Sequence, residues 1–154
     1  LAIAIPGYAF LVNSSRLAAA TNDLVTALQL TRSEAIKRRM RVTVCKTSNA
    51  MADTPVCDTT ASWQQGWLIF VDGGTKGVID SGDTLLRVQD SLSAAVTITT
   101  SNFSSFVSYL PSGKSQGPNE LANGALRVCM ASTRRDIIIN NTGRIRLDPI
   151  PAEC

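Results

Sequence analysis

Residues 16–40 read RLAAATNDLVTALQLTRSEAIKRRM, a stretch that contains neither proline nor glycine. Its apolar and small residues recur at spacings of three and four, which places them on one face of a helix. These residues are Leu17, Ala20, Leu24, Ala27, Leu28, Thr31 and Ala35. Most charged residues lie away from this stripe, so the sequence predicts one long amphipathic helix that packs through a single face.

The residues before this helix, Leu1–Val12, read LAIAIPGYAFLV and are strongly apolar. Twelve residues are too few to cross a bilayer, which requires about 20. A helix of about 40 residues would extend about 60 Å, which exceeds the width of a small domain. We therefore expect the apolar end to project as the remnant of a membrane anchor; the simpler alternative is an ordinary buried helix or strand end.

Short strand-like segments follow the helix. The candidates are 41–47, 66–71, 84–89, 95–100, 105–110, 125–130, 136–140 and 144–147. Polar, turn-rich loops separate them, and Pro149 and Pro151 predict no further ladder pairing in the tail. One long helix followed by strands predicts an α+β fold, with the helix packed on antiparallel β-sheet(s). We expect a single domain, 1–154, with an anchor remnant (1–12), an amphipathic helix (13–40) and a β-rich globular part (41–154).

The composition argues against catalysis. The chain has no histidine, so the commonest general base and the commonest zinc ligand are both missing. No nucleophile has a candidate base beside it in the sequence, and the acidic residues do not follow a calcium-loop spacing. We therefore expect a protein that is not an enzyme and that carries no cofactor or metal.

The four cysteines are Cys45, Cys57, Cys129 and Cys154, and no two of them form a CxxC pair. An even number at wide spacing predicts two disulfides in an oxidising compartment. Three pairings are possible. We favour Cys45 with Cys57, which closes a polar loop, and Cys129 with Cys154, which holds the C-terminal residue; four buried free thiols are the alternative.

The segment IIINNTGRIRL, from Ile137 to Leu147, predicts a β-hairpin. Pairing Ile139 with Ile145 also pairs Ile137 with Leu147, which gives a consistent apolar inner face. The loop then has three residues and ends in Gly143, where a positive φ is expected.

Arg144 and Arg146 alternate with Ile145, so they share the outer face with Cα atoms about 6.5–7 Å apart. Two guanidinium groups at that spacing can hold neighbouring phosphates of one nucleic-acid strand. The alternative is a solvated arginine pair that guards a sheet edge. The same register opposes Asp136 and Asp148, an unfavourable pair that predicts the end of the ladder.

Other basic residues could support such a site. Eleven of the fifteen basic residues are arginine, the residue best suited to bidentate phosphate contact. Five of them lie in the last 28 residues: Arg127, Arg134, Arg135, Arg144 and Arg146. A second cluster, from Lys37 to Arg41, ends the helix, where the helix dipole favours positive charge in any case.

Taken together, these stretches resemble a known family. LAIAIPGY before a long amphipathic helix is similar to the end of the type IV pilin N-terminal helix. Residues 33–45 (SEAIKRRMRVTVC), 64–72 (QQGWLIFVD), 106–117 (FVSYLPSGKSQG) and 134–147 (RRDIIINNTGRIRL) resemble the GspH/FimT group of minor pilins and minor pseudopilins. The resemblance implies a type IV pilin-like fold and contacts with other pilins through the N-terminal helix. It also implies a single-pass inner-membrane protein with a periplasmic globular part, later incorporated into a pilus at the cell surface.

FimT-like members of this group are similar to DNA receptors for natural transformation and carry a Gly-Arg-x-Arg motif. That motif is complete here as Gly143-Arg144-Ile145-Arg146. The resemblance implies DNA uptake through contacts with the phosphate backbone that are mostly independent of sequence. The residues we expect to bind DNA are Arg144, Arg146, Gly143, Arg134, Arg135 and Lys114.

Two structural alternatives stay open within the same group. FimU-like members prime pilus assembly near the tip, and the terminal Cys154 resembles the C-terminus of such proteins. Type II secretion pseudopilins of the GspH kind have an analogous role in a secretion machine. One protein could serve both as a tip subunit and as a DNA binder.

Overall fold

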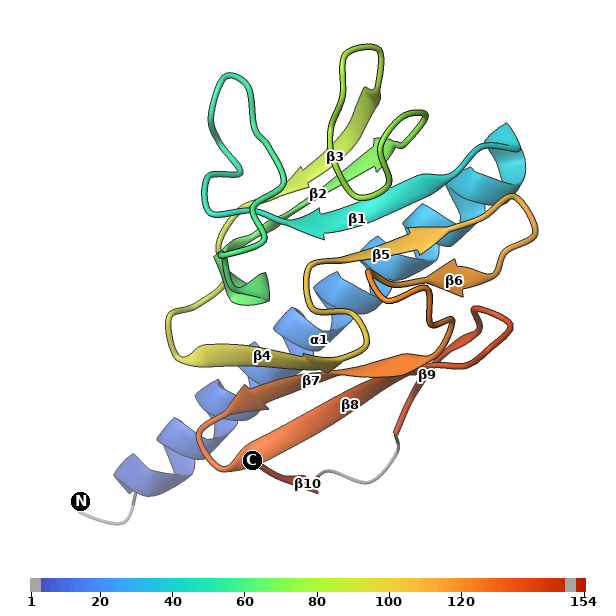
Figure 1. Ribbon diagram of the computed structural model, residues 1–154. Helices are drawn as coiled ribbons and strands as arrows, with labels where there is room; N and C mark the ends of the chain where they lie inside the picture. Colours follow the sequence, from blue (N-terminus) through green and yellow to red (C-terminus); the bar gives the residue numbers. More distant parts are fainter. Residues whose placement is uncertain (1–3, 149–151) are drawn as a thin grey trace.

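The computed structural model describes residues 4–148 and 152–154. In this part of the chain, one long helix precedes a series of strands that form two antiparallel sheets (Figure 1). The elements are α1 (Ala4–Arg38), β1 (Val42–Lys46), the short 3₁₀ helix η1 (Trp63–Gln65), β2 (Trp67–Val71), β3 (Thr84–Gln89), β4 (Val96–Ser101), β5 (Phe106–Tyr109), β6 (Ser115–Gln116), β7 (Gly124–Met130), β8 (Thr133–Ile139), β9 (Ile145–Leu147) and β10 (Ala152–Glu153). The predicted α+β class is confirmed, and each predicted strand overlaps an observed one.

The first sheet has the order β3-β2-β1-β5-β6, and the second has the order β10-β8-β7-β4 with β9 also paired to β8. The prediction of an unpaired tail was wrong, because Ala152 pairs with Arg134 and Glu153 with Thr133. Both tail residues follow Pro151 and keep their own N–H groups. Since β9 covers only the Ile137–Ile139 end of β8, the other end of that edge is open to β10.

Helix α1 packs through the predicted stripe. All seven stripe residues are buried against the two sheets, and Leu24, Leu28, Thr31 and Ala35 have no exposed surface. Pro6 and Gly7 do not interrupt the helix, which runs through both residues in the described span from Ala4 to Arg38.

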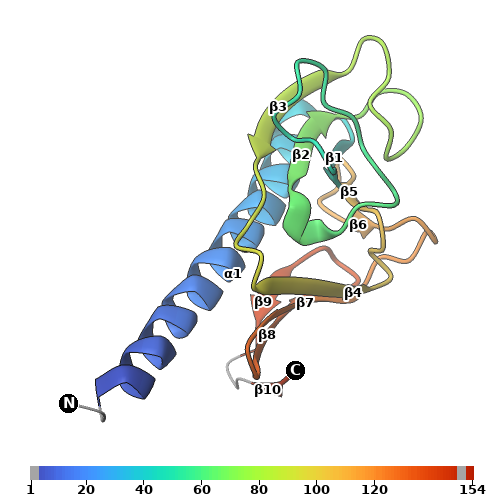
Figure 2. The same cartoon turned by 90° about the vertical axis from the view of Figure 1, so that its left-hand side faces the viewer.

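The N-terminal part of α1 extends beyond the sheets (Figure 2). Along it Tyr8, Phe10 and Leu11 are each about two-thirds exposed or more, at 72%, 68% and 66%. Large apolar side chains in a row on an uncovered helix indicate a surface that another molecule covers. The projecting apolar end that the sequence predicts is thus present among the described residues.

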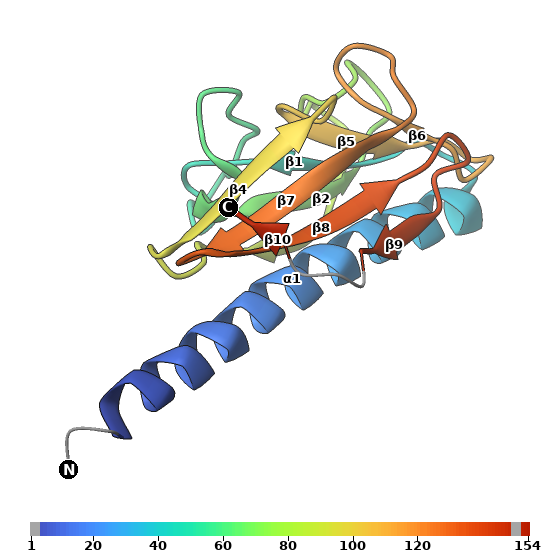
Figure 3. The same ribbon diagram turned by 90° about the horizontal axis from the view of Figure 1, so that it is seen from below.

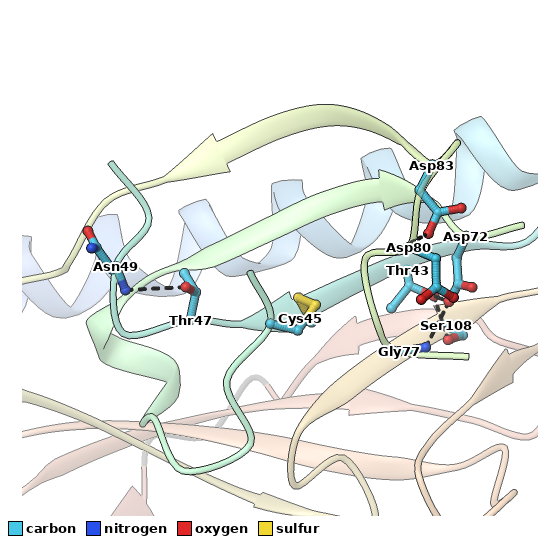
Figure 4. The surroundings of a disulfide bond; sticks show 10 residues. Thr43, Cys45, Thr47, Asn49, Asp72, Gly77, Asp80, Asp83 and Ser108 are labelled. Atoms are coloured by element: carbon cyan, nitrogen blue, oxygen red, sulfur yellow. Dashed lines mark hydrogen bonds between the residues drawn. A yellow bond between two sulfur atoms is a disulfide. The ribbon is translucent and has the colours of Figure 1, made fainter. Parts of the chain in front are cut away.

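A buried polar network links strands of the first sheet, and Figure 4 shows its members Thr43, Asp72, Gly77 and Ser108. Asp72 follows β2 and is 2% exposed. One of its oxygens accepts a hydrogen bond from Arg41 Nη2 at 2.7 Å, and the other accepts from Thr43 Oγ1 at 2.7 Å and the Gly77 N–H at 2.9 Å. Ser108 Oγ lies 2.6 Å from Thr43 Oγ1. The network therefore ties β1, β5 and the loop after β2 to one carboxylate.

Two disulfides join the cysteines in the pairing that the sequence favours. Cys45 in β1 bonds to Cys57, with Cα atoms 5.6 Å apart, beside a small apolar cluster on the face of the first sheet away from α1. Cys129 in β7 bonds to Cys154, with Cα atoms 5.9 Å apart. The second disulfide ties Cys154, the residue directly after β10, to β7. It therefore supports the pairing of β10 with β8, which the two prolines were expected to prevent.

Tyr109 provides a stability prediction. Its side chain is fully buried, and its hydroxyl has no hydrogen-bond partner among the described residues. Burial raises the pKa of Tyr109 above its usual value, and the nearby positive charge of Arg32 opposes that rise. We expect Tyr109→Phe to stabilise the protein by about 1 kcal/mol in denaturant unfolding, because an unsatisfied polar group leaves the core. Tyr8→Phe on the exposed helix should change nothing, and a clear loss of stability in Tyr109→Phe would show that the hydroxyl has a partner.

Candidate nucleic-acid interface

The closing hairpin has the predicted register. Ile137 pairs with Leu147 and Ile139 with Ile145, and Gly143 has a φ of +79°. Ile137 and Ile139 are buried and Ile145 packs against the core, but Leu147 is 38% exposed. The predicted inner face therefore ends before Leu147, because that residue lies at the end of the edge strand.

The ladder ends near the predicted pair of acids. Strand β9 stops at Leu147, although the Asp148 N–H still donates to the Asp136 carbonyl oxygen at 2.9 Å. The Asp136 carboxylate lies 2.8 Å from Arg134 Nε and 3.8 Å from Arg127 Nε. These two arginines offset the negative charge that would otherwise disfavour this end of the hairpin.

Asn140 organises the loop of the hairpin, a role that its place on the outer face did not suggest. Its side-chain oxygen accepts hydrogen bonds from the Thr142 N–H at 3.0 Å, the Thr142 hydroxyl at 2.8 Å and the Arg144 N–H at 2.9 Å. Its carbonyl oxygen accepts from the Gly143 N–H at 2.9 Å. The signal was available, because asparagine two residues before a turn residue commonly forms this type of local bond.

Gly143 rests directly on a second turn, between β5 and β6. A Cβ atom at Gly143 would overlap the carbonyl oxygen of Gly113 and come within 3.0 Å of the Ser115 nitrogen. In the second turn, the Gly113 N–H donates to the Leu110 carbonyl at 2.8 Å, and Gly113 has a φ of +80°. Lys114 lies between the two residues that Gly143 touches, so the fold brings the predicted lysine to the predicted hairpin.

Arg32 on α1 contacts both turns, which no pattern in the sequence indicated. It lies off the buried stripe, yet it is half-buried. Its Nε donates to the Gly113 carbonyl at 3.1 Å and its Nη2 to the Thr142 carbonyl at 3.4 Å. Figure 3 shows β9 beside the C-terminal half of α1, where this contact forms.

The three basic residues around these turns are open to solvent. Arg144, Arg146 and Lys114 are all exposed. None of the three forms an ion pair with an acidic residue within residues 4–148 and 152–154. Arg144 also borders a shallow hollow of about 280 Å³ with Gln29, Arg32, Ser33, Ile36 and Ile145. Among the described residues, the hairpin therefore presents positive charge next to the helix that no ion pair offsets.

The other predicted arginines are placed differently. Arg134 lies on the same face of β8 as Ile138, which pairs with Arg146. It is about 13 Å along the strand from Ile138, and its guanidinium group is paired with Asp136. Arg135 points to the opposite face, where it lines a groove with Phe10 and Leu17 of α1. The structure thus groups Lys114 with Arg144 and Arg146, but not Arg135.

The basic cluster at the helix end is largely paired within the fold. Arg38 Nε lies 2.5 Å and Lys37 Nζ 3.7 Å from the Glu34 carboxylate, and Arg41 binds buried Asp72. The hydrogen bond from Arg38 lowers the pKa of Glu34 below its usual value. This arrangement favours the structural interpretation of the cluster over a role in binding. In the part of the chain that the structure describes, no three acidic or cysteine side chains gather as a metal site would require.

A long helix with a projecting apolar end, packed on two antiparallel sheets, defines a type IV pilin-like protein. The family model described as "Type II transport protein GspH" matches residues 20–143. The chain therefore belongs to the GspH family of minor pilins and pseudopilins. The match ends at Gly143, so Arg144 and Arg146 follow directly after the matched residues.

Solved structures show the same fold. The type IV minor pilin FimU of Pseudomonas aeruginosa, in space group P21, matches with a TM-score of 0.65 and 20% sequence identity, over 90% of this chain and 92% of that chain. A second FimU crystal form, in space group P65, matches with a TM-score of 0.61 and 20% identity, over 85% of this chain and 91% of that one. No curated protein sequence matches the chain.

Proposed function

We propose that this minor pilin binds DNA through the β8–β9 hairpin and acts in DNA uptake during natural transformation. One observation carries the proposal: Arg144, directly before β9, and Arg146, within β9, are exposed without an acidic partner among the described residues, and the docked turn adds Lys114. Phosphate contacts of this kind attract DNA of any sequence. Gly143 supports the site by allowing the two turns to meet.

The form of the surface favours contact with the DNA backbone. Residues 144–154 contain no aromatic side chain, so the hairpin strand offers no platform on which unpaired bases could stack. Two exposed arginines only two positions apart can each contact a phosphate of the same DNA strand. We therefore expect duplex DNA to bind with a Kd of about 1 μM or weaker, strongly dependent on salt.

The N-terminal helix supports a second, structural function. Tyr8, Phe10 and Leu11 form an uncovered apolar surface, which suits packing against other major and minor pilins in a filament. Within the described residues, no helix is long and apolar enough to cross a membrane. We propose a subunit held in the bacterial inner membrane before assembly, with its globular part in the periplasm. A FimU-like priming subunit or a type II secretion pseudopilin would use the same helix.

The DNA-binding proposal predicts a specific loss. Arg144→Ala/Arg146→Ala should weaken duplex binding by at least about tenfold at low salt, because both phosphate contacts are removed. The slope of log affinity against log salt concentration should fall in magnitude by about 1.8, since each contact contributes about 0.9. Fluorescence anisotropy with a labelled duplex at several salt concentrations measures both quantities.

The matched control removes two exposed arginines elsewhere. Arg16→Ala/Arg87→Ala changes the net charge equally, but Arg16 lies on α1 and Arg87 on β3, away from the hairpin. Its binding should stay close to that of the wild type. Equal binding and equal salt slopes for the hairpin variant and the wild type would refute the proposal. Loss of piliation in the hairpin variant with unchanged DNA affinity would favour the structural function instead.

A further inference from the structure

Arg32 is the one charged side chain of α1 seen to bond with both turns of the candidate site among the described residues. Its two donors reach the Gly113 and Thr142 carbonyl oxygens, at 3.1 and 3.4 Å. These acceptors lie 81 and 110 residues away in the chain. The contact therefore joins three distant segments at a single guanidinium group.

The chemistry of the contact requires arginine. A guanidinium group is planar and carries five donors in a fixed arrangement, so two of its nitrogens can bond two separate carbonyl groups at once. Lysine carries the same charge, but its donors all sit on one nitrogen, and its strongly hydrated ammonium does not reproduce a fork. A charge-preserving substitution therefore separates the geometry of Arg32 from its charge.

The two turns depend on each other at this point. Gly143 lies against Gly113 and Ser115 without room for a side chain, and Gly113 itself lies close to Arg32 and Ile36. Arg144 follows Gly143, and Lys114 follows Gly113. The position of each basic residue relative to the other is thus set by whether the two turns stay docked.

We propose that Arg32 is a positioning residue that clamps the Gly113 turn to the Gly143 hairpin, so that Lys114 and Arg144 face one DNA backbone together. The ligand in this statement rests on the proposed DNA binding, whereas the clamp rests on the two hydrogen bonds alone. Arg32 acts on DNA through the turns it holds, because its Nε and Nη2 both donate to carbonyl groups of those turns. The helix that serves filament packing at one end therefore orders the binding surface at the other.

Amide hydrogen exchange on the full chain tests the clamp without DNA. In Arg32→Lys, the amides of Gly143 and Gly113 should exchange at least about tenfold faster, because two charge-assisted bonds are lost and local opening becomes easier. The amides of Val128 and Ile137 in the buried sheet should be unaffected. Arg87→Lys, on exposed β3, is the matched control and should leave both turns unchanged. Unchanged exchange at both turns in Arg32→Lys would overturn the clamp.

Duplex binding then tests the positioning role. Arg32→Lys should lower affinity about three- to tenfold, because Lys114 and Arg144 no longer hold one relative position. Arg32→Gln should lower it similarly with an unchanged salt slope, since no phosphate contact is removed. A slope reduced by about 0.9 in Arg32→Gln would mean that Arg32 itself binds phosphate, and would overturn the positioning role. The positioning role would also be overturned if the turn amides of Arg32→Lys exchanged faster while its DNA affinity stayed equal to that of the wild type. If the wild type fails to bind DNA, the proposed function fails, and the exchange experiment alone decides whether the clamp exists.

Discussion

Gly143→Ala is expected to separate the hairpin from the turn beneath it and to destabilise the protein by roughly 2–5 kcal/mol. Two costs combine. A non-glycine residue at φ +79° is strained by about 1–2 kcal/mol. The new methyl group would also overlap the Gly113 carbonyl and crowd the Ser115 nitrogen, and such overpacking costs about 1–3 kcal/mol. Backbone atoms on both sides cannot move away as a flexible side chain would.

Gly82→Ala is the matched control for this substitution. Gly82 has a φ of +100°, but no atom lies within 4 Å of the place where its Cβ would stand. It should therefore show the cost of backbone strain alone. Urea unfolding of both variants measures the difference. Equal destabilisation would mean that the contact between the turns contributes nothing and that Gly143 serves only its own loop.

The same variant bears on binding. If docking places Lys114 beside Arg144, then Gly143→Ala should weaken duplex binding even though it removes no charge. Its effect should resemble that of Arg32→Lys, with an unchanged salt slope. Full affinity in a folded Gly143→Ala protein would show that the two arginines act without the Lys114 turn.

Asp72→Ala is expected to have the second large effect, a loss of about 3 kcal/mol of stability. Removing one partner of a buried ion pair typically costs about 3–5 kcal/mol, because the remaining charge and donors lose their acceptor. The lower end applies here, since Arg41 is partly exposed and keeps a hydrogen bond to the Gly74 carbonyl at 2.6 Å. Thr43 also keeps Ser108.

Asp53→Ala provides the comparison, because it removes one negative charge from an exposed loop. Its free energy of unfolding, measured in urea, should stay within about 0.5 kcal/mol of that of the wild type. A similarly small change for Asp72→Ala would contradict a structural role for the buried carboxylate. Neither aspartate touches the hairpin, so DNA binding by any folded fraction should be unaffected.

Local patterns in the sequence were enough for most of the fold. The spacing of Leu17 to Ala35 predicted which face of α1 is buried, because one face of a helix repeats every three to four residues. The alternation within 137–147 predicted the hairpin register, because a shift by one residue would turn Ile145 away from the face that holds Ile137 and Ile139. The structure also has the favoured cysteine pairing, one of three that the sequence left possible. Each of these depends on neighbours within one or two elements.

Contacts between distant segments were beyond such patterns. The sequence could list Lys114, Arg134 and Arg135 as basic, but not which of them lie near Arg144. Docking of the two turns brings Lys114 to the hairpin, whereas Arg134 is paired with Asp136 and Arg135 faces the other side of β8. The tail strand β10 forms because β9 leaves part of the β8 edge open. Gly143 was predicted as a turn residue, but its closest constraint is a carbonyl group 30 positions earlier. Arg32 lies off the apolar stripe, and its hydrogen bonds exist because packing of α1 on both sheets brings the two turns to it.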